Sequence, residues 1–554
     1  MDRMRTSITR PHPYILAGLV PALFFILFYF YPLAGICLKS FGSGGQEWNI
    51  LAPFREILAS HRIIKIIGFT FAQAALSALI TLGAALPCAF VFAHYDFPGK
   101  KGVKTLASIP FVLPAVVVAA AFQACLGRSG LLDTHLGLVV DHPLALIFAA
   151  HVFYNFSVML RIISGFWSGL GGQIMEAASL LGASPFRVFR HITLPLLAPA
   201  LWASFALVFI FCFSSFGIIL ILGGPGYATI EAEIYRQAAH LFNLPLAAAL
   251  SLVQIAFTLA LMGFYTRFTR RAAQSLGKKR PCQVAQTPLE KTMVGGVILF
   301  ILLLCVLPLA ALVIKSLTFK GEFSLVFYQA LFTNVSDSIF YIPPVNAVKY
   351  SLFFAGMAMV LALVLGVCAA LFIRHCEGRI PLGRLMDPIF MLPLSTSAVT
   401  LGFGIIITLD KPPLNLRTSI FLIPIAHALV GFPFVVRAVL PALRAIPRQL
   451  GEAATLLGAA PLQVFARVDL PLMSRSLVAG AIFAFTISLG EFGATLFTAR
   501  PDTPTIPVAI YRFLGQPGAM NYGQAMAIST LLMGVTALGY VFIENFRKED
   551  SEGF

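Results

Sequence analysis

Long apolar runs fill most of the chain, and short polar stretches separate them. A helix needs about 20 apolar residues to cross the hydrocarbon core of a bilayer, because every backbone amide must be satisfied within the segment. Strands of a transmembrane barrel would be about ten residues long with alternating polarity, and these runs are continuous. The pattern predicts an all-α integral membrane protein. We expect twelve spans, near 14–37, 66–93, 105–126, 144–165, 195–222, 245–266, 292–314, 349–373, 387–408, 419–440, 472–495 and 523–543.

The composition supports this interpretation, and the distribution of charge predicts how the chain is oriented in the membrane. Of 554 residues, 58% are hydrophobic and only 11% are charged, whereas soluble chains carry roughly 25% charged residues. The net charge of +16 could suggest a nucleic-acid partner. However, Lys and Arg occupy one set of alternate loops about twice as often as the other, as the positive-inside rule predicts. We therefore expect no nucleic acid partner, contact with membrane lipid, and both termini in the cytoplasm.

An internal repeat organises the chain into two halves. The segment EAASLLGASPFRVFRHITLP at 176–195 returns as EAATLLGAAPLQVFARVDLP at 452–471, an offset of 276 residues, with 12 of 20 positions identical. Six spans therefore repeat in parallel, which places a translocation path between the halves. We expect a first half at 1–266, a basic linker at 267–291 and a second half at 292–554. The same offset relates Arg161 to Arg437, Ser215-Phe216-Gly217 to Glu491-Phe492-Gly493, and Ile234-Tyr235-Arg236 to Ile510-Tyr511-Arg512.

The repeated segment predicts a helix, a turn and a second short helix in the cytoplasm. Its first part is rich in helix formers, and Gly182 can leave the helix in the left-handed region at no steric cost. Ser184 and Pro185 suggest an N-cap and first turn of the second helix, whereas Ala460 predicts a weaker cap in the second copy. Leu194-Pro195 then leads into the next span. A helix that merely connects two spans along the membrane surface is the alternative.

The two segments carry a family resemblance. Their pattern of E-A-A, three residues, Gly, nine residues, an aliphatic, one residue and Leu-Pro resembles the cytoplasmic motif of permease subunits of ABC importers that depend on an extracytoplasmic binding protein. The resemblance implies two fused type-I permease halves in a bacterial-type inner membrane, each with a coupling helix that docks on a separate ATPase. The residues implied in coupling are Glu176, Ala177, Ala178, Gly182, Glu452, Ala453, Ala454 and Gly458.

The chain lacks an ATPase motif of its own. No match to G-x-x-x-x-G-K-[ST] exists, and FPGKKG at 97–102 has only a Gly-Lys pair. We therefore expect a non-enzymatic subunit without a cofactor, driven by ATP that a partner binds. Two docking segments imply two copies of a cytoplasmic ABC ATPase, and the resemblance implies an extracytoplasmic solute-binding protein.

Two other classes of membrane protein remain as alternatives. A secondary transporter also uses two parallel six-helix halves, but it usually needs several ionisable groups within the membrane, and mainly Glu491 meets that description. A channel or membrane enzyme would need a filter or a catalytic constellation, and the three histidines His151, His191 and His427 look scattered. The eight cysteines show no metal-binding spacing, so we expect no metal site.

The pore and the solute are less well specified. Glu491 and Phe492, with their counterparts Ser215 and Phe216, are candidates for a pore or gate, since an acid in hydrocarbon needs a cavity or a partner. Glu491 predicts either a cation path or a gate and helix-packing role. The segments at 222–238 and 503–515 resemble permeases of the ferric iron and thiamine group, with ferric iron slightly ahead of thiamine, and phosphonate-type or polyamine solutes behind.

Overall fold

The computed structural model describes residues 13–41, 52–140, 142–170, 172–273, 282–333, 343–377, 381–410 and 414–552. They fall into two compact units. Unit 1 contains residues 1–50, 334–509 and 535–554, and unit 2 contains residues 51–333 and 510–534. Helices α26 (Ile506–Leu514) and α27 (Ala519–Glu552) each contribute residues to both units.

Helices make up nearly all of the described chain, which confirms the all-α prediction. Eleven helices there are long and apolar enough to cross a membrane, one fewer than expected. The exception is the ninth predicted span, 387–408, which forms three short helices, because Pro393 cannot donate a backbone hydrogen bond across the break at Met391 and Thr396 adopts an extended conformation. The last of the three covers only Ala398–Thr408.

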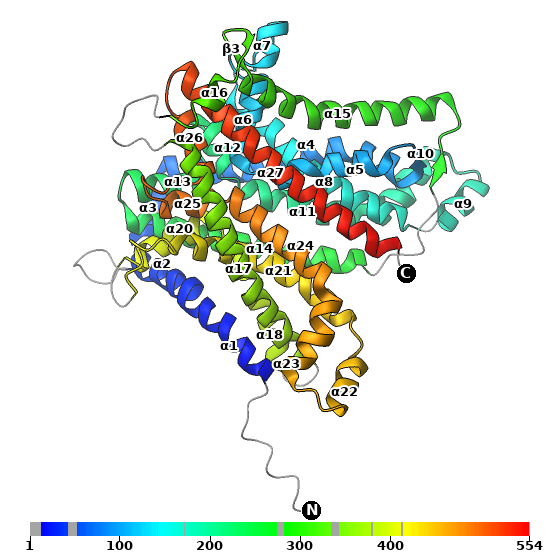
Figure 1. Ribbon diagram of the computed structural model, residues 1–554. Coiled ribbons are helices and arrows are strands. Elements are labelled where there is room, and N and C mark those ends of the chain that lie inside the picture. The colour runs from blue at the N-terminus through cyan, green and yellow to red at the C-terminus, as the bar shows by residue number, and fades with distance from the viewer. Residues whose placement is uncertain are drawn as a thin grey trace, which may run out of the picture. The chain divides into compact units, whose positions relative to one another are not determined.

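Unit 1 is built from helices of both sequence halves (Figure 1). Its elements, besides its parts of α26 and α27, are α1 (Pro13–Phe25), the π-helical turn η1 (Ile26–Phe30), α2 (Tyr31–Phe41), α17 (Pro344–Cys376), α18 (Pro381–Phe390), α19 (Leu392–Ser395), α20 (Ala398–Thr408), α21 (Leu422–Ala445), α22 (Arg448–Leu456), α23 (Pro461–Val464), the π-helical turn η5 (Phe465–Asp469), α24 (Leu470–Gly490) and α25 (Gly493–Thr498).

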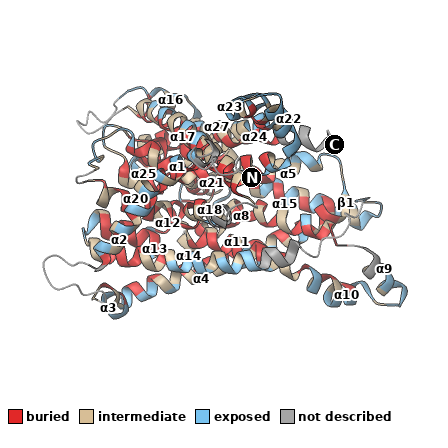
Figure 2. Cartoon of the chain, turned by 90° about the horizontal axis from the view of Figure 1, so that it is seen from below, coloured by how far each residue is buried: buried red, intermediate tan, exposed pale blue. Residues whose placement is uncertain are grey.

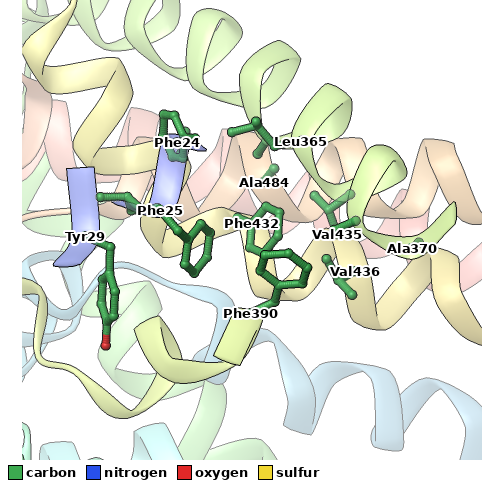
Figure 3. Close-up of a cluster of buried hydrophobic side chains, with 14 of the residues drawn as sticks. Phe24, Phe25, Tyr29, Leu365, Ala370, Phe390, Phe432, Val435, Val436 and Ala484 are labelled. Atoms are coloured by element: carbon green, nitrogen blue, oxygen red, sulfur yellow. The ribbon is translucent and has the colours of Figure 1, made fainter. Parts of the chain in front are cut away.

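An aromatic cluster fixes the first span within unit 1 (Figure 3). Phe25 meets Phe432 of α21 and Phe390 of α18 edge to face, with ring centroids 4.9 and 5.3 Å apart. Such pairs add about 0.5–1.5 kcal/mol each beyond the burial of their area. One turn later, the Tyr29 hydroxyl lies 2.6 Å from the hydroxyl of Thr396. The first span of the chain therefore packs against spans of the second sequence half.

Unit 2 also contains helices of both sequence halves, including its parts of α26 and α27. Its elements are α3 (Ala52–Ala59), α4 (His61–His94), β1 (Tyr95–Asp96), α5 (Lys100–Val112), α6 (Ala115–Leu126), α7 (Leu131–Leu136), α8 (Pro143–Ser168), α9 (Gly172–Leu180), α10 (Pro185–Val188), the π-helical turn η2 (Phe189–Thr193), α11 (Leu194–Phe213), α12 (Gly217–Leu222), the 3₁₀ turn η3 (Gly224–Gly226), α13 (Ile230–Tyr235), the π-helical turn η4 (Arg236–His240), α14 (Leu244–Ala273), β2 (Gln283–Val284), α15 (Pro288–Ser316), β3 (Thr318–Phe319), β4 (Glu322–Phe323) and α16 (Val326–Gln329).

The seventh span, α15, belongs to unit 2 although it opens the second sequence half. It packs on α6, α5 and α4, and its Leu304 and Leu309 lie against the apolar core that Phe122, Phe153 and Ile218 help to form. The two sequence halves thus exchange their first spans: α1 packs with the second half, and α15 packs with the first.

The segment that joins the halves is only partly described. Helix α14 continues to Ala273, so the start of the predicted linker is helical, and residues 274–281 lie outside the described residues. Gln283–Val284 then pairs with Tyr95–Asp96 as two short parallel strands. Helix α15 begins directly afterwards with a capping box, in which Thr287 and Glu290 bond each other's backbone N–H groups.

Candidate coupling and gating sites

Each unit carries one helical hairpin formed by the repeated segment. In unit 2 the hairpin consists of α9 and α10, and in unit 1 it consists of α22 and α23. Gly182 and Gly458 make the turns with φ of +82° and +87°, the left-handed region that a side chain disfavours. This geometry confirms the predicted role of both glycines.

Both hairpins expose the same apolar positions. Leu180 and Leu181 are each 89% exposed, as are their repeat partners Leu456 and Leu457. Phe186 and Leu462 follow on the second helix, at 69% and 77%. Figure 2 shows α10 and α22 largely in the colour of exposed residues. Exposed apolar clusters that recur at equivalent positions are typical of surfaces that a partner covers.

The predicted coupling residues lie on these hairpins. Glu452 and Ala453 are exposed on α22, and Ala454 is half-buried. In α9, Ala177 is exposed and Ala178 is half-buried, while the side chain of Glu176 lies outside the described residues. Small residues on the exposed face leave room for the surface of another protein to approach closely.

The second helix of each hairpin continues into the next span without a break, whereas the sequence predicted a separate short helix. Leu194-Pro195 and Leu470-Pro471 follow the π-helical turns η2 and η5 directly. Proline has no N–H to bond a carbonyl one turn back, and a widened turn accommodates that loss. The structure thus forms uninterrupted helices over Pro185–Phe213 and Pro461–Gly490.

The expected strengths of the two caps are reversed. Ser184 precedes α10, but its hydroxyl makes no capping hydrogen bond. In the second copy, the Gln463 side chain accepts a hydrogen bond from the backbone N–H of Ala460 at 2.9 Å. The sequence argument considered only the residue at the cap position and overlooked the side chain three residues later.

Replacing Gly182 and Gly458 together with Ala should distort both hairpins. A left-handed conformation costs a residue with a side chain about 1–2 kcal/mol, although nothing lies within 4 Å of the added methyl group at either glycine. We expect faster amide hydrogen exchange across residues 177–190 and 453–466. Gly165→Ala, in the interior of α8 with equally open space, is the control and should leave exchange unchanged. Equal protection in the double variant and the control would contradict the role of the turns.

The fifth span of each sequence half is interrupted at the same repeat position. In unit 2, α11 ends at Phe213 and α12 begins at Gly217. In unit 1, α24 ends at Gly490 and α25 begins at Gly493. The candidate gate residues Ser215, Phe216, Glu491 and Phe492 are therefore the residues of the two breaks.

The carboxylate of Glu491 closes the break in unit 1. Its two oxygens accept hydrogen bonds from the backbone N–H groups of Ala494 at 2.8 Å and Thr495 at 2.9 Å, which are the first donors of α25. His427 Nε2 lies 3.3 Å from the same carboxylate. Only 6% of Glu491 is exposed. This geometry favours the helix-packing and gate interpretation of Glu491 over a cation path.

His427 bridges the two sides of this break. Its Nδ1 lies 2.7 Å from the Ser488 hydroxyl in α24, and its Nε2 lies 2.7 Å from the Thr495 hydroxyl in α25. Helix α20 closes the site, because a side chain at Gly402 would come within 2.7 Å of the backbone of Ala494. The ends of both half-helices are thus held by one side chain of α21.

The first half repeats the arrangement with different partners. His151 of α8 lies 2.8 Å from the Ser215 hydroxyl through Nε2 and 2.9 Å from the Ser77 hydroxyl of α4 through Nδ1. Phe216 is buried beside Tyr235, with ring centroids 5.8 Å apart. Residues 214–216, which form this break, include no acid, and the hydroxyl of Ser215 bonds His151 instead.

The two histidines are candidate site residues that the sequence analysis did not pair. His151 and His427 differ by the repeat offset of 276 and come from equivalent spans, so testing every polar residue against that offset would have paired them. Treating them as scattered was wrong. His191, by contrast, is exposed on η2, where its Nδ1 lies 3.2 Å from the Arg187 carbonyl.

The hairpin of unit 1 is also tied to span eight. Arg374, near the end of α17, donates hydrogen bonds to Asp469 of η5 at 3.0 Å and to the Ile446 carbonyl at 3.1 Å. The side chains of Arg374 and Asp469 are largely buried, at 18% and 9% exposure. A displacement of the hairpin therefore acts on α17 as well as on α24.

Comparison with known proteins identifies the family. The family model described as binding-protein-dependent transport system inner membrane component matches residues 85–274 and 362–547. The chain belongs to this family. Each match contains one hairpin and one interrupted span, so the chain is a fusion of two permease segments.

Two similar family members share one description. The thiamine transport system permease protein ThiP of Haemophilus influenzae is 26% identical over 98% of this chain and 97% of its own length. ThiP of Escherichia coli is 26% identical over 84% of this chain and 86% of its own length. Among solved structures, a bacterial ABC transporter involved in the import of the acidic polysaccharide alginate matches 46% of this chain and 94% of that chain, at 20% identity and a TM-score of 0.40.

Proposed function

We propose that this chain is the permease subunit of an ATP-driven importer that moves thiamine across a bacterial-type inner membrane. Similarity to thiamine permeases over 98% of the chain carries the proposal. Ferric iron, which the sequence alone placed slightly ahead, becomes the second candidate, because the similar permeases are described as thiamine permeases. The solute reaches the permease from an extracytoplasmic binding protein.

The two hairpins support docking of two ATPase copies. Each hairpin offers the same exposed Leu pair, and each leads by an unbroken helix to the interrupted span. ATP is bound and hydrolysed by these partners, and the chain itself carries no cofactor. In this arrangement both termini lie in the cytoplasm, together with the hairpins.

The interrupted spans supply the gate. A helix that is broken in the membrane frees backbone groups, which neighbouring side chains must satisfy. In unit 1 Glu491 accepts hydrogen bonds from two of these backbone N–H groups, and His427 bonds the hydroxyls of Ser488 and Thr495 beside them. In unit 2 His151 bonds the hydroxyl of Ser215 at the break. Motion of the hairpins reaches these breaks through α24 and α11, so ATP hydrolysis is converted into movement of the residues at the two interruptions.

Uptake into proteoliposomes tests the proposal. The permease is reconstituted with its ATPase and its binding protein, ATP is enclosed, and radiolabelled thiamine is added outside. We expect thiamine to accumulate only with ATP and only when the binding protein is present. A hundredfold excess of unlabelled thiamine should remove the signal, whereas ferric citrate should not.

Two other results would change the assignment. Uptake driven by an ion gradient without the ATPase would support the secondary-transporter alternative. ATP-dependent uptake of ferric iron without uptake of thiamine would keep the importer class and change the solute. Phosphonates and polyamines are tested in the same assay.

A further inference from the structure

Unit 1 contains an apolar groove on its membrane-spanning part. The groove has a volume of about 830 Å³, within the range of roughly 300–1,000 Å³ that ligand sites occupy. Every residue that lines it is apolar. Helix α17 forms one wall with Leu352, Phe353, Gly356, Val360 and Val364.

Three other elements complete the groove. Phe24 and Phe28 come from α1 and the π-helical turn η1, and Phe421 and Ile425 come from the start of α21. Phe421 is 54% exposed, and Phe353 and Val360 on the α17 wall are 50% and 56% exposed. The walls are therefore open to the medium around α1, α17 and α21, and for membrane-spanning helices that medium is lipid.

The groove has the length of a lipid chain in one leaflet. Its α17 wall extends from Leu352 to Val364, which is about 18 Å at the rise of 1.5 Å per residue. One leaflet of a bilayer has a hydrocarbon depth of about 15 Å, half of the full core. An acyl chain that lies along α17 would therefore fill the groove from end to end.

A basic side chain continues the same helical face. Lys349 lies three and four residues before Leu352 and Phe353, so it occupies the turn beyond the groove on that face of α17, and it is exposed. The residues from Tyr350 to Ile373 are uncharged, and Arg374 follows them. This stretch spans about 36 Å, slightly more than the hydrocarbon core, which places Lys349 at the level of the headgroups.

We propose that this groove binds one acyl chain of an anionic phospholipid, whose phosphate contacts Lys349. The apolar walls hold the chain, and the ammonium group favours an anionic headgroup over a zwitterionic one. A zwitterionic lipid or a detergent molecule is the alternative occupant, and neither would require the Lys349 charge.

Two substitutions separate the contributions of the chain and the headgroup. A side chain built at Gly356 meets no heavy atom within 4 Å, so Gly356→Phe places its ring in the groove without disturbing the core. Gly68→Phe is the matched control, because Gly68 of α4 is exposed, equally open and belongs to unit 2. Lys349→Gln removes only the charge at the end of the groove.

Native mass spectrometry of the full chain in detergent measures the binding. Dioleoyl phosphatidylglycerol and dioleoyl phosphatidylcholine are added separately, and thermal melting checks that each variant is folded. We expect phosphatidylglycerol to bind the wild type more tightly. Gly356→Phe should weaken that binding at least about tenfold, as displacement of two buried methylene groups predicts. Lys349→Gln should lower the preference for phosphatidylglycerol about fivefold, the effect of one Lys at an anionic surface.

Three outcomes would overturn the proposal. Equal binding to Gly356→Phe and Gly68→Phe would place the lipid elsewhere on the chain. Equal affinity of the wild type for the two lipids would show that the groove does not select an anionic headgroup. An unchanged preference in Lys349→Gln would show that another residue recognises the phosphate.

Discussion

Replacing Leu181 and Leu457 together with Asp should release the ATPase from the purified complex and abolish ATP-driven uptake. Both side chains are 89% exposed at the tips of the hairpins, so the change leaves the membrane-embedded core intact. Each buried Leu contributes about 1.5–3 kcal/mol to an apolar contact, and a carboxylate in its place adds a desolvation cost. The ratio of ATPase to permease after affinity purification, and the rate of ATP-dependent uptake, measure the effect.

The single variants test the number of docking sites. With either Leu181→Asp or Leu457→Asp alone, one hairpin is intact, and we expect one ATPase copy to remain. Leu138→Asp is the matched control, since Leu138 is 57% exposed but lies outside both hairpins. A double variant that retains its full ATPase complement would show that the hairpins are connectors between spans.

Glu491→Ala should produce the largest loss of stability among substitutions at the breaks. The change leaves the N–H groups of Ala494 and Thr495 without their acceptor and removes the carboxylate from His427. Each buried N–H group left without an acceptor costs about 1–3 kcal/mol. We expect a clear fall in the thermal unfolding midpoint of the purified protein and loss of uptake. Ser215→Ala removes one hydrogen bond of His151 and should cost only about 1 kcal/mol.

Glu491→Gln distinguishes a packing role from a cation path. The amide keeps an oxygen that can accept one of the two backbone N–H groups, so we expect a milder loss of stability and retained uptake. A Gln variant that melts like the wild type but no longer transports would show that the negative charge itself serves the solute, and the cation-path interpretation would replace the one favoured here.

The sequence predicted the all-α membrane fold better than it predicted the number and packing of the spans. Apolar runs located the spans because a membrane helix must satisfy its own backbone, and that rule is local. It failed at 387–408, where Pro393 and the extended Thr396 divide an apolar run that is otherwise long enough. The exchange of α1 and α15 between the units was also beyond its reach. Which face of an apolar helix finds which neighbour depends on packing, and the side chains of α1 are apolar on every face.

The candidate sites, too, could be predicted only where the physical cause is local. The hairpin turns followed from Gly182 and Gly458, because a left-handed glycine has a local physical reason that the sequence displays. The role of Glu491 did not, since its partners His427 and Thr495 come from α21 and from the far side of an unexpected break. The repeat offset relates His427 to His151, but only the three-dimensional structure shows that both histidines lie beside an interruption.

The exchange of first spans has a consequence for biosynthesis. Helix α1 ends at Phe25, and α17, on which it packs, begins only at Pro344. At about 5–20 residues per second, roughly 15–60 s of translation separate the insertion of α1 from the appearance of its neighbour. During that interval Phe25 and Tyr29 lack the neighbours that they contact in the finished unit 1. Assembly of α1 into unit 1 therefore has to wait for the second sequence half, and chain termination before α17 would leave that helix without its native contacts.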